Sequence, residues 1–120
     1  MVDPVEVAGR FRAENEKERS VIAGRREGAR KAGRELAEAI VAGHPEVMRV
    51  WGFGSTFESW RAFRMDSDID LAVEAGNVLE LSRLVEGLGF SVDLVDLSEC
   101  PDTLAVFIRS QGVVLAEAGR

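Results

Sequence analysis

The sequence has little of several features that define whole classes of protein. Its single cysteine, Cys100, excludes an internal disulfide, and a lone cysteine beside a proline is more often packing than a catalytic thiol. No apolar run approaches the roughly 20 residues that a membrane-spanning helix needs. The N-terminus also lacks the apolar core of a signal peptide. We therefore expect a cytoplasmic protein with no membrane contact. The only histidine, His44, lies in a Gly-His-Pro loop, and we expect no catalytic role for it.

An excess of basic residues is missing too. The chain has 15 Lys and Arg against 21 Asp and Glu, which gives a net charge of −6. This balance argues against nucleic acid as a partner, because such proteins display a basic surface. The charge is unevenly spread: residues 10–35 hold nine Lys or Arg and five Glu, and residues 36–120 hold six Arg and fourteen acids. A basic N-terminal arm therefore precedes an acidic body.

We predict that residues 1–44 form a helical arm. Asp3 can cap a helix and Pro4 suits its first position. Helix-favouring residues then continue to a stop at residues 43–45. A glycine inside a helix costs roughly 1 kcal/mol, so one long rod and two helices with a break near Gly24 both remain open. The apolar stripe that should pack on the body comprises Leu36, Ala37, Ile40 and Val41.

Residues 45–120 alternate between strand and helix patterns. We expect strands at residues 47–53, 69–74 and 91–97, with a further short strand at residues 113–115. We expect helices at residues 55–62, 78–88 and 101–110. The predicted fold class is therefore α+β, with a small mixed sheet of three to four strands packed against helices.

The strongest chemical signal is Ser67-Asp68-Ile69-Asp70-Leu71. Alternate residues of a strand share a face, so Asp68 and Asp70 point the same way with their Cα atoms ~6.6 Å apart. A polar turn before an ordinary strand would explain Asp68 but not Asp70, which lies between two apolar residues. A divalent cation would relieve the repulsion, since Mg²⁺ prefers carboxylate and phosphate oxygens. The pattern thus predicts a metal site used in phosphoryl transfer.

A second signal is the end of the first predicted strand at Gly54-Ser55. Glycine lets the backbone approach a phosphate closely, and the free N–H groups at a helix start bind anionic oxygens. On its own Gly-Ser favours a plain turn. It gains weight here because Ser55 lies 13 positions before Asp68 and directly follows an apolar strand.

A third acid interrupts the later strand Val92-Asp93-Leu94-Val95-Asp96. Asp93 and Asp96 have opposite parity, so a regular strand directs only one of them toward the aspartate pair. We favour Asp93, because it lies deeper between apolar neighbours. This carboxylate would complete the metal site or accept the proton of an attacking hydroxyl.

In combination, these residues resemble the minimal nucleotidyltransferases of the DNA polymerase β-like superfamily. The resemblance covers about residues 45–116 and rests on Gly54, Ser55, Asp68, Asp70 and Asp93. It implies a polymerase β palm-like fold, Mg²⁺ or Mn²⁺ as cofactor and ATP as substrate. Catalysis and metal binding would then fall to the three aspartates, and nucleotide binding to Gly54 and Ser55.

One departure from the family pattern concerns positive charge. Members often carry a small residue, Arg and Gly soon after Gly-Ser, whereas this chain reads Thr56-Phe57-Glu58. Arg61 or Arg64 would then supply the missing charge, unless both simply face solvent.

The resemblance also implies a role. Many such small proteins are antitoxins that transfer AMP from ATP to a tyrosine of a HEPN-domain toxin. The alternative is a protein that keeps the fold but neutralises or regulates a partner by binding alone. A small-molecule transferase of the aminoglycoside type is a weaker option, because such enzymes usually need an added domain for the acceptor.

The arm suggests a further interaction. Residues 11–33 have too few apolar side chains to pack along their whole length, and helices in proteins gain most of their stability from packing. We expect the arm to dock on an acidic surface of a toxin or of a second copy, which would give a homo-oligomer. The alternative is a solvated helix laced with ion pairs, each worth about 0.2–0.5 kcal/mol.

Overall fold

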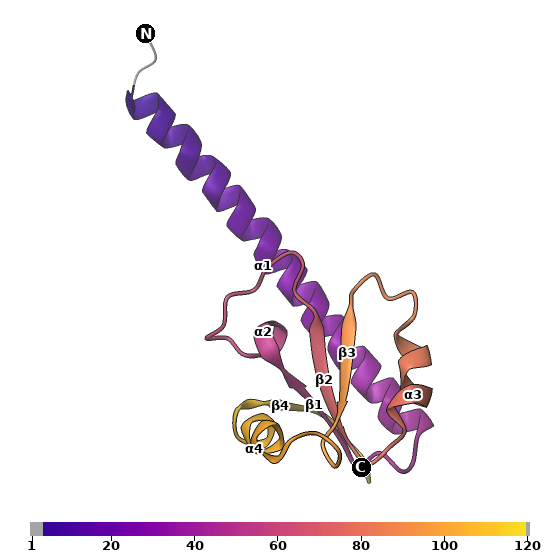
Figure 1. Cartoon of the computed structure of the whole chain (residues 1–120). Helices are drawn as coiled ribbons and strands as arrows, with labels where there is room; N and C mark the ends of the chain where they lie inside the picture. The colour runs from indigo at the N-terminus through magenta and orange to yellow at the C-terminus, as the bar shows by residue number, and fades with distance from the viewer. Residues whose placement is uncertain (1–3, 120) are drawn as a thin grey trace.

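The arm is one continuous helix in the computed structural model, which describes the backbone of residues 4–119 and the side chains from residue 13. Helix α1, Pro4–Gly43, has 40 residues and passes through Gly24 without a break. At ~1.5 Å per residue it is ~60 Å long, and it accounts for the long axis of a molecule of 67 × 30 × 25 Å (Figure 1). The capping role predicted for Asp3 lies outside the described residues. No helix in the described part of the chain is long and apolar enough to cross a bilayer.

The body is a mixed four-stranded sheet, as the sequence predicted. The strands are β1 (Arg49–Phe53), β2 (Ile69–Glu74), β3 (Val92–Asp96) and β4 (Val113–Glu117). Their order is β3-β2-β1-β4. β1 pairs antiparallel with β2 and β4, and β2 pairs parallel with β3. Between the strands lie α2 (Gly54–Phe57), α3 (Val78–Leu81), the 3-10 turn η1 (Ser82–Val85) and α4 (Asp102–Gln111).

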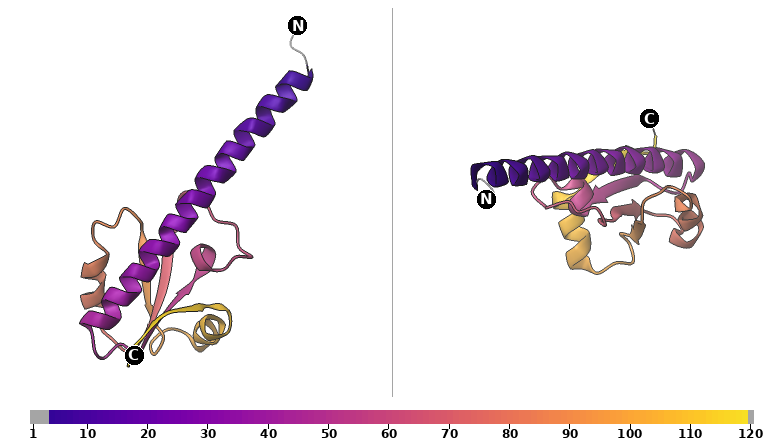
Figure 2. Two further views of the ribbon diagram at one scale, coloured as in Figure 1. Left: turned by 180° about the vertical axis from the view of Figure 1, so that it is seen from behind. Right: turned by 90° about the horizontal axis from the view of Figure 1, so that it is seen from above.

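The two faces of the sheet are covered by different helices (Figure 2). Ile69, Leu71 and Val73 of β2 face α1, whose buried stripe includes Leu36 and Ile40. On the other face, Ala72 packs with Ala105 and Ile108 of α4. Strand parity therefore directs the odd-numbered residues of β2 toward α1 and its even-numbered residues toward the face that carries α4.

Two predicted helices are shorter than the sequence indicated. The segment expected to be helical at residues 78–88 leaves the α-helix at Leu81 and continues as one 3-10 turn. Only Leu81 of its apolar stripe is fully buried, and Leu84 stays 40% exposed, so packing does not extend the helix. The segment expected at residues 55–62 is a single turn, because Glu58 adopts an extended conformation directly after it.

The basic residues of the arm contact the body of this same chain. Arg26 and Arg30 donate to the carbonyl of Thr56, and Arg26 also donates to that of Glu58 at 2.7 Å. Arg25 stacks on Phe90, with its guanidinium 4.0 Å from the ring centroid. Backbone carbonyls and an aromatic ring of the same chain therefore hold these three arginines, and the acidic docking surface expected for the arm stays a prediction. By contrast, residues 13–20 are exposed throughout and project past the sheet.

Two glycines make room for one aromatic ring. A Cβ atom at Gly33 of α1 would lie 2.6 Å from Cζ of Phe57, and a Cβ at Gly52 of β1 would lie 2.6 Å from Cδ2 of the same ring. Phe57 is 8% exposed, so its ring fills the space between α1 and β1 that side chains would otherwise take. This packing fixes the one-turn helix α2 against both elements.

The same substitution at two positions of α1 should therefore have opposite effects. Gly24 has open space around it, so Gly24→Ala should stabilise the helix by about 0.5–1 kcal/mol. Gly33→Ala should destabilise the protein by about 1–3 kcal/mol, because the added methyl overpacks the Phe57 site. Urea unfolding followed by circular dichroism measures both. If Gly33→Ala stabilises as much as Gly24→Ala, the Phe57 packing is wrong.

Candidate active site

Two of the predicted acids are direct neighbours in the sheet. Asp70 of β2 and Asp93 of β3 are partners in the parallel register. Paired residues of adjacent strands share a face, and here it is the face that carries α4. Phe53, the last residue of β1, is the partner of Asp70 on the other side. Asp70 is half-buried between its two neighbouring strands, and Asp93 is exposed.

Asp68 comes just before β2 and has the parity of Asp70. Its backbone is fixed by Thr56, whose buried hydroxyl donates to the carbonyl of Asp68 at 2.9 Å. The carbonyl of Thr56 in turn accepts from Arg30 of α1 at 2.7 Å. One threonine thus connects the arm, the turn after β1 and the start of the aspartate strand.

Asp96 has a different environment from Asp93. Its Oδ1 accepts from the backbone N–H of Ser98 at 2.9 Å and from the Ser98 hydroxyl at 2.6 Å. These bonds close the turn after β3, and Asp96 lies opposite Val73 rather than opposite Asp70. The structure therefore brings Asp93 to Asp70 and leaves Asp96 as a turn residue at the other end of the strand.

The electrostatics of the site are those of crowded acids. The pKa of Asp70 is raised from 3.8 to about 6, chiefly by burial and also by the charges of Asp93 and Asp68. Glu58 also raises this pKa, whereas the guanidinium of Arg61 lowers it. A cation among these carboxylates would favour the ionised form of Asp70.

Position 54 needs a glycine for two reasons: the backbone conformation of the turn, and the lack of room for a side chain beside Asp70. Its φ of +72° lies in the left-handed region that favours glycine. A Cβ atom there would collide with Oδ2 of Asp70. The Asp70 carboxylate therefore stands where a side chain at position 54 would lie, and the backbone of Gly54 is directly beside that acid. Ser55 follows as the second residue of α2.

Sequence reasoning missed Thr56 and Glu58. Thr56 has no exposed surface, and Glu58 is 3% exposed. In the sequence both fall within the short helix expected at residues 55–62, and no apolar periodicity there indicates that they are buried. The available signal was the departure from the family pattern: the residues after Gly-Ser lack the usual Arg-Gly step and include an acid, Glu58.

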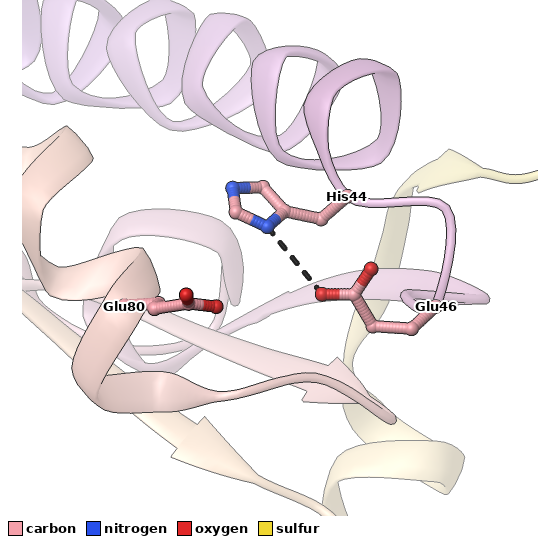
Figure 3. A group of neighbouring side chains, drawn as sticks. All are labelled: His44, Glu46 and Glu80. Carbon is pink, nitrogen blue, oxygen red and sulfur yellow. Dashed lines mark ion pairs between the residues drawn. The ribbon is translucent and has the colours of Figure 1, made fainter.

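Another group of potential metal ligands lies away from the aspartates (Figure 3). The ligand atoms of His44, Glu46 and Glu80 all lie within 4.8 Å of one another, and His44 Nδ1 is 3.4 Å from Glu46 Oε1. The group lies where α1 ends and α3 begins, whereas Asp70 pairs with the far end of β1. Both glutamates are exposed to water, so nothing in their surroundings requires a cation.

The comparisons with known proteins identify the family. A sequence model described as "Polymerase beta, Nucleotidyltransferase" matches residues 35–120. The chain therefore belongs to the polymerase β-type nucleotidyltransferases. The match begins inside α1, whose residues 36, 37 and 40 are buried against the sheet, and the arm before residue 35 lies outside it. No protein with a curated function matches the chain.

Solved structures of toxin–antitoxin complexes are similar to this chain. One was crystallised with AMP-PNP; it is 28% identical, with a TM-score of 0.59 over 72% of this chain and 73% of that chain. Another contains a tri-AMPylated Shewanella oneidensis HEPN toxin with an MNT antitoxin; it is 27% identical, with a TM-score of 0.55 over 75% and 73%. A third, MntA-HepT, is 26% identical, with a TM-score of 0.54 over 74% and 73%.

The raised pKa of Asp70 predicts that this residue lowers the stability of the folded protein, and that the loss depends on pH. Between about pH 4 and pH 6 the folded protein binds more protons at Asp70 than the unfolded chain, so this group lowers stability as the pH rises through that window. In metal-free buffer, Asp70→Asn should raise the melting temperature by a few degrees at pH 7.5. The gain should vanish near pH 4.

Asp96→Asn is the matched control, because its side chain still accepts the Ser98 bonds. Its melting curve should follow the wild type across the same pH range. An Asp70→Asn variant that melts at or below the wild-type temperature at pH 7.5 would contradict the crowding of charge at this site.

Proposed function

We propose that this protein is a metal-dependent nucleotidyltransferase that moves AMP from ATP onto an acceptor hydroxyl, a tyrosine of a HEPN-type toxin, and so acts as an antitoxin. The observation that carries the proposal is the pairing of Asp70 with Asp93 on adjacent strands, beside Asp68 and the turn at Gly54. A fold could hold carboxylates this close as a structural accident. The raised pKa of Asp70 speaks against that, since such crowding is unfavourable without a cation.

The residues present fit a hard divalent cation. Asp68, Asp70 and Asp93 offer only carboxylate oxygens, which are the donors that Mg²⁺ and Mn²⁺ prefer. We assign the metal to these three side chains. When bound, the ion supplies the positive charge that stabilises the phosphate oxygens during transfer.

The protein's own side chains perform the remaining tasks. Gly54 lies against the carboxylate of Asp70, and Ser55 follows it in α2, so a nucleotide held by the backbone of this turn has its phosphates beside the acids. Asp68 and Asp93 are both exposed, whereas Asp70 is half-buried. The carboxylate of Asp93 is reachable by an acceptor hydroxyl, whose proton it can take as the hydroxyl oxygen attacks the α-phosphorus and pyrophosphate leaves.

The nucleotide and the acceptor are assigned from similar proteins. One similar structure holds AMP-PNP, and another contains an AMPylated HEPN toxin with an MNT antitoxin. The chain covers 73% of each of those chains, so the likeness includes most of their length. We extend ATP, a HEPN-type partner and protein adenylylation to this protein on that basis.

AMP transfer should require Asp93, the acid of β3 that pairs with Asp70, and should not require Asp96. With radiolabelled ATP, Mg²⁺ and a HEPN-type toxin, wild-type protein should label a toxin tyrosine, identified by mass spectrometry. Asp70→Asn and Asp93→Asn should lower the rate by at least a hundredfold, and chelation of the metal should abolish it. Asp96→Asn should retain wild-type transfer, because that carboxylate closes a turn. Loss of transfer in Asp96→Asn but not in Asp93→Asn would overturn the assignment.

The same variants separate catalysis from binding alone. If the protein is an enzyme, Asp70→Asn should fail to protect cells that express the toxin, even though the two proteins still form a complex. Protection by Asp70→Asn equal to that of the wild type would favour the alternative, in which the fold neutralises its partner without chemistry.

The projecting part of α1 is the surface we assign to the partner. Residues 13–20 are exposed throughout, and Val21 is 56% exposed beside them. Deletion of residues 1–20 removes this segment and keeps Ile22, which packs against the core, and Arg25, Arg26 and Arg30 on the body. The truncated protein should keep its melting temperature and lose affinity for the toxin in a calorimetric titration. Unchanged affinity, with an unchanged mass in solution, would show that the segment is not an interaction element.

A further inference from the structure

Glu58 is a buried carboxylate that the proposed mechanism does not use. Its side chain has no exposed surface. No hydrogen-bond donor among the described residues reaches either of its oxygens. An ionised carboxylate in such a place is costly unless a charge of opposite sign lies beside it. The position therefore requires a cation as its neighbour.

Arg61 is that cation. Its Nε lies 3.3 Å from Oε2 of Glu58. Its guanidinium also lies over two aromatic rings, 4.8 Å from the centroid of Trp60 and 5.5 Å from that of Phe107. The side chain is 41% exposed. The contact with Glu58 is made through Nε, and a guanidinium has two further nitrogens that can donate to other acceptors.

The pair lies at the edge of the aspartate cluster. The backbone N–H of Glu58 donates to the carbonyl of Gly54 at 2.9 Å, and Gly54 is the residue in contact with the Asp70 carboxylate. Glu58 therefore lies one helical turn after Gly54, the residue that contacts Asp70. In agreement with this geometry, Asp70 senses the charges of both Arg61 and Glu58.

A triphosphate approaching this site meets an excess of negative charge. Asp68, Asp70 and Asp93 are joined by Glu58, and the family's usual arginine after Gly-Ser is missing. A guanidinium held at the edge would offset the repulsion, and its planar fork suits phosphate oxygens.

Arg64 is less suited to that task. Its backbone N–H bonds to the Ser67 hydroxyl at 2.8 Å and its carbonyl accepts from the Ser67 N–H at 3.1 Å, so it belongs to the turn before β2. Its side chain is exposed. Of the two arginines, Arg61 is the one whose charge lowers the pKa of Asp70.

We propose that Arg61 binds the β- and γ-phosphate oxygens of the nucleotide, and that the buried carboxylate of Glu58 is a positioning residue that holds Arg61 in place. The assignment rests on the proposed nucleotidyltransferase function. It means that the arginine usual after Gly-Ser is missing, and that Arg61 provides the phosphate contact with the acid Glu58 as its support.

Equilibrium binding of AMP-PNP and of AMP, measured by calorimetry in Mg²⁺ buffer, tests the assignment without any turnover. Arg61→Ala should weaken AMP-PNP binding about tenfold or more, the effect of losing charged hydrogen bonds. AMP binding should change less than twofold, because AMP lacks the outer phosphates. Arg64→Ala is the matched control and should bind both ligands as the wild type does.

Further variants separate positioning from direct contact. Glu58→Gln should also weaken AMP-PNP binding while leaving AMP binding unchanged, because it releases Arg61. Glu58→Gln combined with Arg61→Ala should bind no more weakly than Arg61→Ala alone, since the two residues act through one contact. The double variant also removes the unpaired buried charge that Arg61→Ala leaves, so it keeps the test valid if the single variant unfolds.

The outcomes are distinct. Wild-type affinity for AMP-PNP in the double variant, or an equal loss in Arg64→Ala, would overturn the assignment and leave the proposed function standing. Failure of the wild-type protein to bind AMP-PNP at all would overturn both.

Discussion

The site depends on the packing of one ring. Phe57 fills the space that side chains at Gly33 and Gly52 would occupy, and so fixes α2 between the arm and β1. Three residues close to Phe57 in sequence make contacts at the site. Gly54 touches Asp70, the hydroxyl of Thr56 donates to the carbonyl of Asp68, and Glu58 pairs with Arg61. Because interiors are close-packed, a shift of the ring would move all three together.

The long helix is part of this arrangement as well as an appendage. Gly33 admits the Phe57 ring, and Arg26 and Arg30 bond to carbonyls of the turn. These carbonyls come at the end of a one-turn helix, where backbone acceptors have no partners within the helix. The arginines supply the missing donors. The arm thus contacts one side of this turn, and the aspartates contact its other side.

The sequence predicted the parts of the fold that rest on periodicity. Strand β2 occupies residues 69–74 as expected, since Ile69, Leu71 and Val73 alternate with Asp70. Parity likewise put Asp93 rather than Asp96 on the side of Asp70, which agrees with the parallel register. The extent of the short helices was not predictable, because it depends on whether residues such as Leu84 find a packing surface. The roles of Thr56 and Glu58 depend on contacts with distant segments, which no local pattern encodes.

The rod-like arm also changes how the protein behaves as a particle. A compact chain of 120 residues has a radius of gyration of about 14 Å, whereas this one has 18.1 Å. Such a molecule diffuses more slowly and rotates less uniformly than a sphere of the same 13.1 kDa. A lone copy would therefore elute from a sizing column ahead of globular standards of its mass and look like a dimer. Light scattering or sedimentation equilibrium, which weigh the particle whatever its shape, are the methods that can count its copies.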